Sequence, residues 1–249
     1  MKKIISFLIA ATAIFALTCQ YAAAECTDYY IMRKKDHARP TLEPDMRYMS
    51  EYDGYYIGKD EKVIYLTFDA GYENGNVERI VDTLDKHGAK GTFFVLDNIV
   101  RRDTDLVMKM AEHGHTVANH SAHHKNMSYM TAEECEIELR QLESVYKEMT
   151  GKTMAKFFRP PEGKFSRRLL KNVSDLGYKT VFWSFAYADW DNNKQPSPDY
   201  AVKLILDNTH NGEIILLHPT SKTNADILDT LLTKWEEQGY RFGTLDELV

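Results

Sequence analysis

The segment Val63–Gly71 reads VIYLTFDAG, an apolar run that stays uncharged until Asp69 and ends at a glycine. A short run rich in β-branched and aromatic residues predicts a buried strand. Gly71 lets the backbone turn sharply after the strand. The segment therefore predicts a strand that presents a carboxylate at its C-terminal end.

The chain from Lys62 onward repeats this pattern, because short apolar runs alternate with longer amphipathic ones. Further strands are predicted near residues 91–96, 116–119, 156–158, 180–184, 213–217 and 240–242. Helices are predicted at 77–87, 103–113, 131–150, 166–176, 198–208 and 225–238, each followed by a glycine. We expect an incomplete or distorted (β/α) barrel, with an open doubly wound sheet as the alternative.

The first 24 residues have the pattern of a secretory signal peptide. Two lysines precede an apolar run at 4–17, and three alanines at 22–24 precede the expected cleavage site after Ala24. A membrane anchor needs a run of about 20 apolar residues, so we expect export and no membrane attachment after cleavage. Residues 25–60 are expected to form an extension packed on the barrel, and 61–249 the catalytic domain.

Composition places the chain among ordinary globular proteins, with 43% hydrophobic and 27% charged residues. The formal net charge of -6 gives no broad basic field, which argues against nucleic acid as a partner. The predicted mature chain keeps Cys26 and Cys135, too few for a disulfide scaffold or a cysteine zinc site. Whether these two cysteines pair is left open.

Residues suited to catalysis follow five of the predicted strands: Asp69, His120 with His124, Arg159, Asp189 with Trp190, and His218. Because the C-terminal ends of parallel strands meet at one edge, we expect these side chains to converge. Histidines four apart on a helical turn can bind one metal ion. Each residue alone also has an ordinary structural explanation, such as a helix cap, an exposed arginine or a core histidine.

Together, the segments resemble the five motifs of polysaccharide deacetylases, the NodB-homology enzymes of carbohydrate esterase family 4. The matching segments are Thr67–Gly71, His120–His124, Arg159–Gly163, Asp189–Trp190 and Leu216–His218. The resemblance covers roughly residues 62–249 and implies the NodB-homology type of distorted barrel.

The resemblance also implies a role for each site residue. Asp69 would be the general base, held by Arg159, and His218 the general acid, oriented by Asp189. His120 and His124 would bind a divalent metal ion, expected to be zinc. The substrate-binding residues would be Tyr72, whose amide would face the oxyanion, Trp190 and Leu216 around the acetyl methyl, and Phe165 and Tyr187 near the sugar rings.

Two positions depart from the family pattern. Ala70 replaces the usual metal-binding aspartate after the base, and Ala186 replaces an aspartate three residues before Asp189. Alanine cannot coordinate a metal, so we expect weak metal binding, with water, Glu73 or Asn74 completing the site.

Segments Tyr65–Gly75, Phe182–Ser184 and Tyr52–Gly58 are most similar to the spore-cortex branch of the family, which deacetylates N-acetylmuramic acid before the muramic δ-lactam forms. This implies a peptidoglycan strand as partner, an amidase acting upstream, and a monomer in the cell wall or the intermembrane space of the forespore. Two alternatives are a deacetylase of N-acetylglucosamine in peptidoglycan or chitin-like glycan, and a catalytically impaired glycan-binding module.

Overall fold

The computed structural model describes residues 26–34 and 36–248, so the predicted signal peptide lies outside the described residues. The strands are β1 (Thr27–Asp28), β2 (Gly54–Tyr55), β3 (Val63–Ala70), β4 (Gly91–Val95), β5 (Thr116–Asn119), β6 (Ala155–Phe158), β7 (Lys164–Phe165), β8 (Lys179–Val181), β9 (Glu213–Leu217) and β10 (Arg241–Phe242). The α-helices are α2 (Val77–Lys86), α3 (Asp97–Arg102), α4 (Thr104–Glu112), α5 (Ala132–Thr150), α6 (Arg167–Asp175), α7 (Pro198–Asn208) and α8 (Lys222–Glu237). The 3-10 helices are η1 (Pro44–Tyr52), η2 (Pro161–Gly163) and η3 (Leu245–Leu248).

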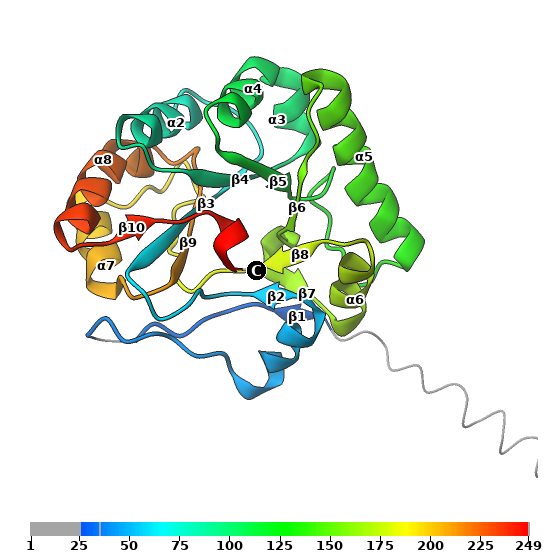
Figure 1. Cartoon of the computed structure of the whole chain (residues 1–249), viewed down its shortest axis with the longest axis horizontal. Helices are drawn as coiled ribbons and strands as arrows, with labels where there is room; N and C mark the ends of the chain where they lie inside the picture. Colours follow the sequence, from blue (N-terminus) through cyan, green and yellow to red (C-terminus); the bar gives the residue numbers. More distant parts are fainter. Residues whose placement is uncertain (1–25, 35, 249) are drawn as a thin grey trace, which may run out of the picture.

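The main sheet is parallel and curls into an incomplete barrel with helices around it (Figure 1). Its strand order is β10-β3-β4-β5-β6-β8-β2, and β9 pairs with β3 on the other edge. Between β9 and the β8–β2 end of the sheet, the described chain has two isolated bridges, Phe185 to Ile215 and Ile57 to Glu213. The prediction of a distorted (β/α) barrel is confirmed, and the open doubly wound sheet is wrong.

Side chains alternate between two layers along β3. Ile64, Leu66 and Phe68 belong to the core between the sheet and the outer helices. Val63 and Tyr65 belong to the small core inside the barrel, which Leu245 of η3 helps to fill. Because successive strand residues face opposite sides, Asp69 lies on the inner face with Tyr65. The strand period therefore directs the carboxylate into the barrel mouth.

The N-terminal extension runs along the barrel between α6 and α7, as the blue segment of Figure 1 shows. It also contributes a strand, because β2 pairs with β8. Side chains of the extension, including Met46 and Met49, share a core with α6 and β6.

The predicted strands and helices are all present, and two differences affect the site. Helix α3 was not predicted, because its six residues are too few to show a helical period. Strand β8 ends at Val181 rather than near residue 184, and residues 182–189 follow an irregular path. No helix in the described part of the chain is long and apolar enough to cross a membrane.

Candidate active site

A cavity of about 700 Å³ opens at the C-terminal ends of the strands. Eight of the predicted site residues line it: Asp69, Tyr72, His120, His124, Tyr187, Trp190, Leu216 and His218. Arg159 and Asp189 are buried behind this lining and contact Asp69 and His218. The structure therefore brings residues of five separate strand ends to one place.

Asp69 is held by a fully buried arginine. Nη1 of Arg159 donates to Oδ1 of Asp69 at 2.8 Å. Burial raises the pKa of Asp69, but the positive charge of Arg159 outweighs burial and holds it below its ordinary value. Asp69 is therefore ionised at neutral pH and can accept a proton.

The other two guanidinium nitrogens of Arg159 also have acceptors. Nε donates to the Val181 carbonyl at 2.9 Å, and Nη2 donates to Oγ1 of Thr67 at 2.8 Å and to the Phe182 carbonyl at 3.1 Å. The guanidinium carbon lies 4.3 Å from the ring centroid of Phe94. These contacts fix the guanidinium in one orientation, so the carboxylate of Asp69 is fixed as well.

His218 and Asp189 form the second pair. Oδ1 of Asp189 accepts from Nδ1 of His218 at 2.7 Å, and Oδ2 accepts from the His218 backbone amide at 2.8 Å. Burial alone lowers the pKa of His218, but Asp189 and the more distant Asp69 raise it above the ordinary 6.5. His218 is thus favoured in the protonated form that can donate a proton.

His120 is a buried, neutral imidazole. Its Nδ1 lies 2.8 Å from the Arg159 carbonyl, which accepts from it, so Nε2 carries the lone pair. Burial lowers the pKa of His120 to about 4. Nε2 lies 3.5 Å from Oδ2 of Asp69, so two groups with lone pairs face each other. A cation shared between these atoms would satisfy both.

The two predicted metal ligands do not lie on a helical turn, and that part of the prediction is wrong. Residues 120–126 form an irregular loop in which Ser121 and His124 have positive φ angles of 69° and 55°. Oγ of Ser121 accepts from the His124 amide at 2.9 Å and stabilises this turn. The rings of His120 and His124 still meet, with centroids 5.0 Å apart.

These donors fit a divalent ion through two imidazoles, with Asp69 beside them. Within residues 26–34 and 36–248, no group of three or more histidine, cysteine, aspartate or glutamate side chains is arranged to hold a metal. A closed site would have four protein ligands. The two imidazoles therefore fit an open site that leaves positions for water.

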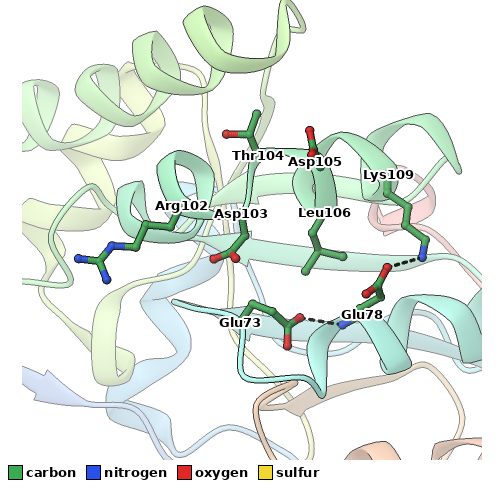
Figure 2. A pocket seen from close by; sticks show the side chains of 8 residues that line it. All are labelled: Glu73, Glu78, Arg102, Asp103, Thr104, Asp105, Leu106 and Lys109. Atoms are coloured by element: carbon green, nitrogen blue, oxygen red, sulfur yellow. Dashed lines mark hydrogen bonds and ion pairs between the residues drawn. The ribbon is translucent and has the colours of Figure 1, made fainter.

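Glu73 and Asn74 do not fill the position left by Ala70, so the prediction is wrong for these two side chains, and water as the third candidate stays a prediction. Figure 2 shows Glu73 beside the start of α2, in a separate cavity of about 590 Å³. Its carboxylate accepts from the Glu78 amide at 2.9 Å and from the Val77 amide at 3.3 Å, because the first amides of a helix need acceptors. The Asn74 side chain donates to the Thr220 carbonyl at 2.9 Å.

Phe165 is the one predicted substrate-binding residue that the structure places elsewhere. It is completely buried, with its ring centroid 5.0 Å from that of Phe182. Strand β7 directs this side chain into the core beneath the N-terminal extension. The prediction that it faces the sugar is wrong. Trp190 and Tyr72 are exposed at the cavity rim, where they can contact a sugar.

Several residues of the site were not predicted, and Asn224, Trp183 and Glu162 are three of them. Nδ2 of Asn224 donates to Oδ2 of Asp189 at 2.6 Å and to the His218 carbonyl at 3.0 Å. An asparagine directly before the predicted helix 225–238 also fits an ordinary helix cap, so no local signal identifies Asn224. Trp183 and Glu162 line the cavity, and Glu162 has a positive φ of 58°.

Comparisons with known proteins agree with this geometry. A family model described as polysaccharide deacetylase matches residues 57–181. The peptidoglycan-N-acetylmuramic acid deacetylase PdaA of Bacillus subtilis is 39% identical over 254 residues, covering 100% of this chain and 96% of that protein. The solved structure of Bacillus subtilis PdaA, a family 4 carbohydrate esterase, has a TM-score of 0.87 and covers 90% of this chain and 97% of that one. The peptidoglycan-N-acetylglucosamine deacetylase PgdA of Listeria monocytogenes is 34% identical over 190 residues, 76% of this chain and 39% of that protein.

Proposed function

Since this chain belongs to the polysaccharide deacetylases of carbohydrate esterase family 4, we propose that it hydrolyses the N-acetyl group of N-acetylmuramic acid in peptide-stripped peptidoglycan. The observation that supports the chemistry is the pairing of Asp69 with Arg159 and of His218 with Asp189 in one cavity. The likeness to PdaA along the whole chain supports the sugar.

The two pairs supply a base and an acid for amide hydrolysis. Ionised Asp69 takes a proton from the attacking water as its oxygen bonds to the acetyl carbon. Protonated His218 gives its proton to the nitrogen as the carbon–nitrogen bond breaks, which releases acetate and a free amine. The backbone amide of Tyr72, a residue of the cavity lining, would donate to the oxyanion.

His120 and His124 would hold the divalent ion, proposed to be zinc. When bound, such an ion polarises the acetyl carbonyl and lowers the pKa of water. Arg159 keeps Asp69 ionised next to this charge, and the Arg159 carbonyl keeps Nε2 of His120 unprotonated.

We expect zinc to be lost readily from the protein. Two imidazoles give fewer ligands than a closed zinc site has, so dialysis against chelator should leave the mature protein largely metal-free. Calorimetric titration should then show weak zinc binding, weakened further by about tenfold or more in His124→Asn. His123→Asn is the matched control, because His123 pairs with Glu138 outside the cavity. Stoichiometric zinc after chelation would contradict a weak site.

The biological setting is part of the proposal. The product, a muramic acid with a free amine, can close into the δ-lactam of spore cortex. The enzyme would act as an exported monomer in the cell wall or the forespore intermembrane space, after an amidase has removed the peptide. N-acetylglucosamine is the second candidate substrate, because PgdA of Listeria monocytogenes is named for that sugar.

Acetate release tests the dependence on the amidase. The mature protein with added zinc is incubated with peptidoglycan strands before and after complete amidase digestion. We expect release only from the digested strands. Equal rates from both would contradict the need for peptide removal, and release from chitin oligomers alone would support the glucosamine alternative.

A further inference from the structure

The first residues of the described chain run beside the cavity. We use the name strap for residues 27–33. Its strand β1 pairs antiparallel with β7, and the Tyr29 amide donates to the Gly163 carbonyl at 3.0 Å. Gly163 lines the cavity, so the strap lies directly behind one of its walls.

Tyr29 of the strap holds Trp183, which also lines the cavity. The Tyr29 hydroxyl donates to the Trp183 carbonyl at 2.6 Å, and the two rings meet edge to face at 5.0 Å. A Cβ added to Gly163 would lie 2.8 Å from the Trp183 ring, so this indole is confined between Gly163 and Tyr29. Burial raises the pKa of Tyr29, which keeps its hydroxyl protonated and able to donate.

Arg33 of the strap holds the next part of the same wall. Its Nη2 donates to the Ala186 carbonyl at 2.7 Å, and its guanidinium carbon lies 5.1 Å from the Phe185 ring centroid. Ala186 and the adjacent Tyr187 both line the cavity. Two strap residues thus bind two carbonyls of one short segment.

The segment after β8 has little regular structure of its own. Residues 182–189 form no strand, although they carry Trp183, Ala186 and Tyr187 of the cavity wall and end at Asp189. Backbone carbonyls that leave a sheet must find other donors. Tyr29 and Arg33 supply these donors for two of them.

We infer that Tyr29 and Arg33 are positioning residues, which hold residues 182–189 of the cavity wall in the arrangement that binds the glycan substrate. The inference deepens the proposed function and rests on it. No strap residue hydrogen-bonds to Asp69, Arg159 or His218 among the described contacts. Loss of the strap contacts should therefore raise KM and leave kcat nearly unchanged.

The test compares Tyr29→Phe and Arg33→Gln with two matched controls. Tyr146→Phe changes a buried tyrosine of α5, and Arg47→Gln removes an exposed arginine side chain from η1. Acetate release from peptide-stripped glycan should show KM raised about two- to tenfold in each strap variant, the range expected for one lost hydrogen bond, with kcat within about twofold of wild type. Arg33→Lys keeps a positive charge and a hydrogen-bond donor, so it should raise KM less than Arg33→Gln does.

Hydrogen–deuterium exchange provides a readout that does not need activity. Exchange in the peptide covering residues 182–189 should rise in the strap variants and stay unchanged in the controls. Strap variants with wild-type KM and wild-type exchange would overturn the inference. If the wild type releases no acetate from any glycan, the proposed function fails. The inference about the strap is then tested by exchange in residues 182–189 and by the calorimetric affinity for peptide-stripped glycan. Strap variants with wild-type exchange and wild-type affinity would overturn it.

Discussion

Asp69→Asn should lower kcat by roughly 10³-fold on peptide-stripped glycan, within the range for loss of a general base. The amide keeps the size of the side chain and an oxygen that can accept from Nη1 of Arg159. It cannot take a proton from water at neutral pH. Steady-state acetate release, with a thermal unfolding curve of the same sample, measures both activity and fold.

Asp97→Asn is the matched control for this change. Asp97 also forms an aspartate–arginine ion pair, with Arg101, but it does not line the cavity. We expect near-normal turnover from Asp97→Asn. A residual rate within about tenfold of wild type in folded Asp69→Asn would remove Asp69 from the role of base.

His218→Gln should lower kcat by about 10²- to 10³-fold and change the pH profile. Asp189 and Asp69 raise the pKa of His218 above its ordinary 6.5, against the effect of burial. Since the protonated form is the acid, the wild-type rate should fall as pH rises through that raised pKa. Glutamine does not titrate, so this alkaline decline should be absent from kcat/KM of the variant.

Hydrolysis of an activated ester distinguishes the role of the acid from that of the base. Nitrophenolate leaves without protonation, so 4-nitrophenyl acetate hydrolysis should survive His218→Gln better than amide hydrolysis does, and should fail in Asp69→Asn. His113→Gln is the matched control, because His113 pairs with Asp85 outside the cavity. An alkaline limb that persists in His218→Gln would contradict its assignment as the acid.

The positions of the main site residues could be predicted because they follow from strand period and strand direction. Asp69 ends an apolar run, and His218 follows another, Glu213–Leu217. Parallel strands bring such ends to one edge of the barrel. The resemblance to polysaccharide deacetylases then implied that Arg159 holds Asp69 and that Asp189 orients His218.

Other features depend on contacts between residues far apart in sequence. Asn224 reaches Asp189 across 35 positions, and Tyr29 reaches Trp183 across 154. Glu73 is near the expected metal in sequence, but the free amides of α2 bind its carboxylate. Phe165 follows the Arg159–Gly163 motif, but its ring packs into the core beneath the N-terminal extension. Local pattern does not determine which of these competing partners prevails.

The most direct test is mass spectrometry of peptide-stripped glycan strands that contain both sugars, after incubation with the mature protein and zinc. Loss of acetyl from muramic acid residues, with the glucosamine residues intact, is the predicted result. Samples with chelator, or with Asp69→Asn, should keep every acetyl group. Acetyl loss from glucosamine residues alone, or none from either sugar in the zinc-supplied sample, would contradict the proposed function.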